Sequence, residues 1–192
     1  MNIKKMVRES LLKKPKRVYE YGCVMVGLDL DGKEWKNIQG MIDEDDIYHG
    51  DKESGTDGGF GRELDPHVTV LFGVHANVPD EDVEKIIDKC KKPEVELQKI
   101  STFDNELFDV LKFDVNSPDL HELNELFKKL PYTTEYPNYH PHATICYLKK
   151  GMGKKYKEKM KNIDPIVVKP NEILYSKPDG TKKRLSLIHI WR

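Results

Sequence analysis

Two stretches of the chain align position by position, PHVTVLF at residues 66–72 and PHATICY at residues 141–147. Each begins with proline and histidine, continues through a small apolar residue and a threonine, and ends in β-branched and aromatic residues. Such a composition after a proline is typical of a β-strand. Because residues two apart share one face of a strand, His67 lies beside Thr69, and His142 beside Thr144. The sequence therefore predicts two equivalent strands that each present one histidine and one threonine.

The residues around these two strands predict a duplicated α+β layout, in which each motif strand has a helix nearby and a strand pair lies between them. Turn and capping residues separate the elements. The other predicted strands cover residues 18–28, 94–103, 108–115, 166–168 and 173–175 and a last strand from 184, and the predicted helices cover residues 34–41, a segment from 79, a segment from 117, and 154–161. A small domain with this element order can bring the two motif strands to one cleft.

Two histidines that face one phosphodiester can divide the proton transfers between them, since the pKa of imidazole lies near neutrality. One histidine would deprotonate the attacking hydroxyl and the other would protonate the leaving oxygen. The hydroxyls of Thr69 and Thr144 can donate hydrogen bonds to the non-bridging phosphate oxygens. This chemistry needs no metal and no cofactor. Metal binding by His67, His140 and His142 is the competing use, but it leaves both threonines unexplained.

The composition bounds the class of protein. A chain of 192 residues makes one domain or two closely packed lobes, and 38% hydrophobic with 34% charged residues indicates a globular protein. The formal net charge of -1 argues against long nucleic acid as a partner. No apolar run has membrane-spanning length, which argues against a membrane partner. The three cysteines form no CxxC pair, which favours reduced cysteines in a cytoplasmic protein. The oligomeric state stays open.

The expected domain organisation has four parts. Residues 1–17 form a basic N-terminal arm, and residues 18–187 form a single bilobal domain. Within it, the acidic, glycine-rich residues 43–62 are expected to be a mobile surface loop. Residues 185–192 resemble the translation of a sequencing adapter, so this tail is interpreted as a candidate artefact, with a native C-terminal strand as the alternative.

The two His-x-Thr motifs resemble the paired HxTx signatures of the 2H phosphoesterase superfamily. The resemblance covers residues 18–185 in layout, although only the motifs are highly specific. It implies an α+β fold of two pseudo-symmetric lobes, each a small antiparallel sheet with outer helices, and HxTx strands that line a central cleft. Within the superfamily, the phrases at residues 21–25, 66–75 and 139–151 are most similar to phage anti-CBASS proteins.

That resemblance implies a metal-independent phosphodiesterase that cleaves 3′-5′ bonds of cyclic di- and trinucleotide messengers, cyclic GMP–AMP among them, so that a phage evades bacterial immunity. His67 and His142 are then the acid and base in an unassigned order, and Thr69 and Thr144 hold the phosphate. The resemblance further suggests that Glu172 lies in a nucleotide pocket, with Tyr175 as an aromatic nearby. Tyr21 could stack on a base, or could equally be a core tyrosine.

Two other functions use the same residues. The first is an RNA-end enzyme that acts on 2′,3′-cyclic phosphates or 2′-5′ linkages, which would favour a broad basic surface. The second is a cyclic-nucleotide sponge without turnover. Pure binding does not require paired proton-transfer groups, so the two intact motifs favour an enzyme.

Overall fold

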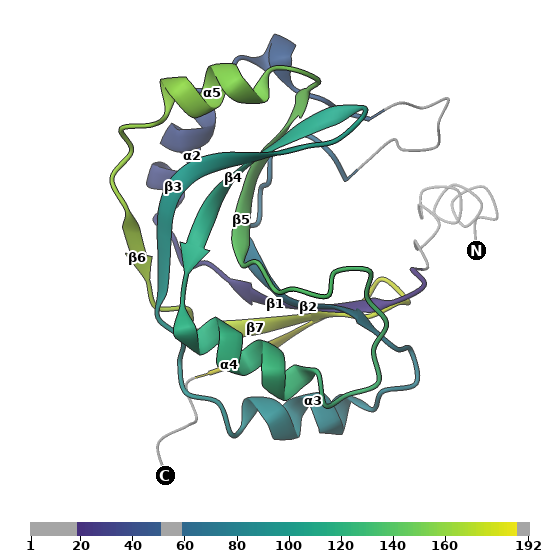
Figure 1. The fold of residues 1–192 in the computed structure, drawn as a ribbon. Helices are drawn as coiled ribbons and strands as arrows, with labels where there is room; N and C mark the ends of the chain where they lie inside the picture. The colour runs from purple at the N-terminus through teal and green to yellow at the C-terminus, as the bar shows by residue number, and fades with distance from the viewer. Residues whose placement is uncertain (1–18, 51–58, 188–192) are drawn as a thin grey trace, which may run out of the picture.

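The computed structural model describes residues 19–50 and 59–187 (Figure 1). The predicted basic arm, residues 51–58 of the predicted loop and residues 188–192 of the tail lie outside the described residues. The described strands are β1 (Gly22–Gly27), β2 (His67–Val74), β3 (Val95–Asp104), β4 (Phe108–Asn116), β5 (His142–Lys149), β6 (Ile166–Val168), β7 (Glu172–Ser176) and β8 (Lys182–Ser186). The described helices are α2 (Gly32–Gly40), α3 (Asp80–Ile87), α4 (Pro118–Phe127) and α5 (Gly153–Lys159), with a short 3₁₀ turn, η1 (Glu44–Asp46).

The strands form two four-stranded antiparallel sheets, in the orders β2-β1-β7-β8 and β5-β4-β3-β6. Each sheet has four strands and has a motif strand at one edge, so the two sheets correspond in their strand order. The motif strands β2 and β5 contact one another where the sheets meet (Figure 1). This is the predicted α+β class, with two pseudo-symmetric lobes and the motif strands at their junction.

The helices cover the sheets in a crossed arrangement. Helix α2 follows β1 of the first sheet but packs behind the second, where Trp35 lies 6.4 Å from the ring of Phe113 on β4. Helix α4 follows β4 of the second sheet but packs on β2 of the first. Figure 1 shows α3 and α4 below the first sheet, and α2 and α5 beside the second. Each lobe therefore contains a helix that the chain supplies from between strands of the other lobe.

Local sequence explains where the helices begin. Ser117 caps α4, because its side chain accepts a hydrogen bond from the Leu120 amide at 3.2 Å and Pro118 occupies the first helical position. Asp31 and Gly32 are residue types that also favour turns, but here they start α2, since the Asp31 carboxylate accepts a hydrogen bond from the Lys33 amide at 3.1 Å. Aspartate is favoured in both settings because its short side chain bonds the backbone two residues on.

One continuous core of buried apolar side chains runs through both lobes. Val68 and Val70 of β2 and Ile145 of β5 contribute to it from the motif strands. Burial of each such side chain stabilises the fold by roughly 1.5–3 kcal/mol before conformational entropy is counted. Residues on either side of 51–58 also contact β5: Ile47 is buried and bridges to Leu148, and Arg62 bridges to Cys146.

Candidate active site

The two motif strands have the same burial pattern. In each, the histidine and threonine are half-buried, the residue between them is buried, and two buried residues follow the threonine. This repetition places both His-Thr pairs on the exposed side of their sheets, at the junction of the lobes. The structure thus brings together His67 and Thr69 from one lobe with His142 and Thr144 from the other.

A β-bulge directly after each threonine explains the two consecutive buried residues. Met25 of β1 pairs with Thr69 and Val24 pairs with Leu71, so Val70 is the extra residue on β2. In the other lobe, Lys112 pairs with Thr144 and Leu111 with Cys146, so Ile145 is the extra residue. A bulge changes the direction of a strand and its side chains, and bulges are frequent beside active sites.

Buried amide side chains satisfy the carbonyl group of each bulge. Asn124 on α4 donates to the carbonyl of Val70 at 2.7 Å. Gln39 on α2 donates to the carbonyl of Ile145 at 3.2 Å, and this carbonyl also accepts from the Glu63 amide at 3.0 Å. A buried carbonyl outside a regular ladder needs such a partner. Because α2 and α4 are the crossed helices, each amide reaches a motif strand distant in sequence.

Both histidines are held by the same hydrogen bond. Nδ1 of His67 lies 2.8 Å from the carbonyl oxygen of Asp65, and Nδ1 of His142 lies 2.9 Å from that of His140. A carbonyl oxygen only accepts, so Nδ1 carries the hydrogen in both rings. Nε2 is then the nitrogen available for proton transfer in each.

The surroundings of the two histidines differ in polarity. In the first lobe, Gly27 lies opposite His67 and contributes no side chain. In the second lobe, Asp114 lies opposite His142, and Lys112 lies opposite Thr144. Burial lowers the pKa of His142, and the positive charges of Lys112 and of a protonated His67 act in the same direction.

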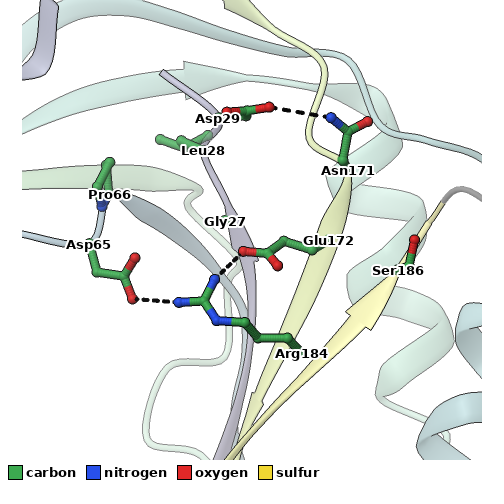
Figure 2. Close-up of a pocket in the computed structure, with 9 residues that line it drawn as sticks. All are labelled: Gly27, Leu28, Asp29, Asp65, Pro66, Asn171, Glu172, Arg184 and Ser186. Atoms are coloured by element: carbon green, nitrogen blue, oxygen red, sulfur yellow. Dashed lines mark hydrogen bonds and ion pairs between the residues drawn. The ribbon is translucent and has the colours of Figure 1, made fainter. Parts of the chain in front are cut away.

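A pocket of about 490 Å³ adjoins the first motif, and Figure 2 shows its lining residues. Glu172 stands at the start of β7 beside Gly27, which separates it from His67; a Cβ on Gly27 would lie 3.2 Å from its Oε1. Arg184 of β8 pairs with Glu172 and also lies 3.4 Å from Asp65 (Figure 2). The predicted pocket residue Glu172 is therefore a close neighbour of the first motif.

The two predicted tyrosines lie elsewhere. Tyr175 is 1% exposed and belongs to the hydrophobic core. Tyr21 precedes β1 at the end opposite Gly27, about 20 Å along the strand from the level of His67. There its ring lies 5.9 Å from that of His75.

Other polar groups near the motifs have structural roles. Tyr139 donates its hydroxyl to the carbonyl of Thr69 at 3.0 Å, which ties the segment before β5 to β2. The Cys23 thiol lies 4.0 Å from the Thr69 hydroxyl. Burial raises the pKa of this thiol to about 11. This cysteine is therefore a neutral thiol at physiological pH and a poor nucleophile.

The alternative of a metal centre finds no ligand cluster in the part of the chain that the structure describes. Within residues 19–50 and 59–187, no group of three or more histidine, cysteine, aspartate or glutamate side chains is placed to hold a metal ion. His140 contributes its backbone carbonyl to His142, and its side chain is exposed.

Among residues 19–50 and 59–187 no helix has the length and hydropathy that crossing a membrane requires.

The similarity to one solved structure, Usb1, supports the fold. Usb1 of Kluyveromyces marxianus is similar with a TM-score of 0.53 at 14% identity, over 88% of this chain and 98% of that one. LigT of Escherichia coli, in a complex with 3′-AMP, is similar with a TM-score of 0.49 at 13% identity, over 87% of this chain and 95% of that one. No curated protein sequence matches the chain.

The two lobes and the paired motif strands define the fold of the 2H phosphoesterase superfamily. A family model described as "Anti-CBASS protein Acb1" matches residues 55–177, a segment that contains both motifs. The chain belongs to this anti-CBASS family. The predicted anti-CBASS family is confirmed, and the fold is the one that the predicted superfamily implies.

Sequence reasoning missed several polar residues near the motifs, namely Lys112, Asp114, Gln39, Asn124 and Tyr139. Lys112 and Asp114 gave a signal, since two charges at alternate positions interrupt the apolar strand FDVLKFDVN at residues 108–116. Alternation places both on one face of the strand. The sequence signal for Gln39 and Asn124 was weaker. An amide side chain within the apolar stripe of a helix indicates a buried hydrogen-bond acceptor only when the element that packs on the helix is known.

Proposed function

We propose that this protein is a metal-independent phosphodiesterase that cleaves 3′-5′ bonds in cyclic di- and trinucleotide immune messengers. It would act in the cytoplasm of the host bacterium and let a phage evade CBASS defence. The observation that carries the proposal is the matched pair of motifs, each with its histidine, its threonine, the same Nδ1 hydrogen bond and the same bulge. Membership of the anti-CBASS family supports the substrate class.

The two histidines perform the proton transfers. With Nδ1 bonded to a backbone carbonyl, neutral imidazole accepts a proton at Nε2 from the attacking ribose hydroxyl or water. The second histidine, in its protonated form, delivers a proton from Nε2 to the oxygen that leaves phosphorus. Positioned proton transfer of this kind typically accelerates a reaction by about 10²–10⁴-fold.

The two threonines stabilise the charge that develops on the phosphate. Thr69 and Thr144 stand two residues after their histidines on the same exposed side, so each hydroxyl can donate to a non-bridging oxygen beside an imidazole. The bulge after each threonine, with its carbonyl held by Asn124 or Gln39, keeps this side of the strand in a defined orientation.

Recognition of the nucleotide falls to the pocket beside the first motif. Glu172 can accept hydrogen bonds from the Watson–Crick edge of a base, and it lies next to His67 across Gly27. Tyr21 offers a ring for base stacking at the far end of β1. Tyr175 is not included in the proposed contacts, because its ring is in the core.

The test is a cleavage assay of the purified protein in EDTA on a panel of 3′,3′-cyclic dinucleotides and cyclic trinucleotides, read by chromatography. His67→Ala and His142→Ala run alongside. We expect cleavage in EDTA and a loss of about 10²-fold or more in each variant, since each removes one proton-transfer group. The His49→Ala variant, which changes an exposed histidine outside both motifs that lies 3.3 Å from Glu44, is expected to retain turnover.

Three other outcomes would each contradict part of the proposal. Intact cyclic ligands together with cleavage of 2′,3′-cyclic or 2′-5′ linked RNA would indicate an RNA-end enzyme. Tight binding of cyclic nucleotides without turnover would indicate a sponge. Cleavage that stops in EDTA and returns with a divalent cation would exclude a metal-independent reaction.

A further inference from the structure

Lys112 is the only buried lysine among residues 19–50 and 59–187. Its side chain is 7% exposed, whereas the next most buried lysine in an ion pair, Lys128, is 27% exposed. Strand pairing places Lys112 opposite Thr144, and Asp114, two residues on, opposite His142. Burial of an ammonium group is costly unless it is paired, so a lysine at this position calls for a reason beyond packing.

The ammonium group of Lys112 has a partner for each of its three N–H bonds. It donates to Ser101 Oγ at 2.7 Å and to Asp114 Oδ1 at 2.5 Å, and it lies 4.2 Å from the centre of the Phe103 ring. The first two contacts are hydrogen bonds, and the third is a cation–π contact. With its donors in use, Lys112 is poorly placed to bind a phosphate directly, and it acts through its neighbours.

Phe103 connects Lys112 to the second motif. Its ring meets the ring of His142 edge-on, with centroids 4.9 Å apart and an interplanar angle of 89°. His142 is therefore held on two sides, by this ring and by the carbonyl of His140. His67 has the equivalent carbonyl bond, but Gly27 stands opposite it where Asp114 stands opposite His142.

We propose that Lys112 is a positioning residue that, through Phe103 and Asp114, orients His142 and makes it the proton acceptor of the reaction. This inference rests on the proposed phosphodiesterase function and assigns the two roles that the motifs leave open. The O–H bond of the nucleophile breaks and its proton goes to Nε2 of His142, while the oxygen bonds to phosphorus. The bond from phosphorus to the leaving oxygen breaks, and that oxygen takes the proton from Nε2 of His67.

The charges around His142 support the assignment. The titratable groups that act on it are Lys112 and Asp114 on β4 and His67 on β2, and the exposed Lys99 on β3 lies 3.9 Å from Asp114. Burial lowers the pKa of His142 most, and the charges of Lys112 and His67 lower it further, against the opposing effects of the His140 carbonyl and, to a lesser degree, Asp114. A histidine with a lowered pKa is neutral at physiological pH, which is the form that accepts a proton.

The test compares Lys112→Met with the unchanged protein by NMR titration of the His142 ring, assigned with His142→Gln, and by the pH profile of kcat/KM. Lys112→Met removes a positive charge that lowers the pKa of His142 and takes from Asp114 its buried partner, so we expect the pKa of His142 to rise and the acidic limb of the profile to move to higher pH with it. We expect kcat to fall by about tenfold or more with a smaller change in KM, since orientation of the base is lost. Lys112→Arg is expected to restore part of kcat.

Two further variants separate this role from a general effect on folding. Asp109→Asn also removes a buried charge from β4, but Asp109 pairs with Lys150 and the turn before α5, so the His142 titration is expected to stay unchanged. Phe103→Leu keeps the Lys112–Asp114 pair and removes the ring contact with His142, and it is expected to lower kcat. This variant tests the inference if Lys112→Met does not fold.

An unchanged His142 titration in folded Lys112→Met, or an acidic limb that follows His67 instead, would overturn the inference. The two levels of the argument fail separately. If the unchanged protein cleaves no phosphodiester, the proposed function is wrong, while the NMR titration still decides whether Lys112 controls His142.

Discussion

Single side chains carry the proposed chemistry at the level of the residue. Each half-buried histidine is tied through Nδ1 to a carbonyl two residues before it, so the ring orientation comes from the local backbone. The hydroxyl of each neighbouring threonine has a different proposed role, which is a hydrogen bond to the phosphate. This difference makes the threonines the sharper test of transition-state stabilisation.

We expect Thr144→Val to lower kcat by about 10²-fold, because it removes one donor to the developing charge while it keeps the β-branched shape. Thr144→Ser, which retains the hydroxyl, is expected to stay within about tenfold of the unchanged protein. Steady-state kinetics on the cyclic substrate measure both. A valine variant with unchanged kcat and raised KM would show that the threonine only contributes ground-state binding.

At the level of the element, each motif strand has a glycine with positive φ near or just after its end. Gly73, near the end of β2, has a φ of 100°, and Gly151, just after β5, has a φ of 87°. A Cβ on Gly73 would lie 1.7 Å from the carbonyl oxygen of Thr133, whereas a Cβ on Gly151 would meet no atom within 4 Å. The two sites therefore share the conformational demand but differ in the space available.

We expect Gly151→Ala to cost about 1–2 kcal/mol of stability, the penalty of a left-handed backbone for a residue with a Cβ. Gly73→Ala is expected to cost about 3 kcal/mol or more, because the backbone of the segment at Thr133 has to move as well. Urea unfolding monitored by circular dichroism gives both values. Equal losses at the two sites would mean that the segment at Thr133 yields without cost.

At the level of the whole molecule, the crossed helices interlock the two lobes. Gln39 of α2 reaches β5, and Asn124 of α4 reaches β2, so neither sheet keeps its covering helix if the other half of the chain unfolds. A single core also runs through both lobes. These features favour all-or-none unfolding over independent melting of two halves.

We therefore expect one urea transition by two probes that report on different lobes. Trp35 fluorescence reports on the second sheet, because its ring lies beside Phe113. Labelling of Cys90, read by mass spectrometry, reports on the first lobe, since this cysteine follows α3 and burial raises the pKa of its thiol to about 11. Separate midpoints for the two probes would show that the lobes unfold independently.

Much of the element order could be predicted from the sequence, because strand and helix patterns are local. The predicted strand pair at 94–103 and 108–115 matches β3 and β4, and the helix predicted from Ser117 and Pro118 matches α4. The first strand is shorter than predicted, Gly22–Gly27 within the predicted range 18–28. Tyr175 shows the limit of the approach, since an aromatic in a short strand can face the ligand or the core.

By itself, the sequence determined the two motif strands, their shared histidine and threonine faces and the α+β class, because these follow from two-residue alternation and from a repeated motif. Only the tertiary structure decided which residues surround each histidine. Glu172 reaches the side of His67 across Gly27, and Phe103 and Asp114 reach His142, through strand pairings and contacts between residues distant in the chain. Pairing partners and register depend on the packing of the whole domain, so no local pattern contains them.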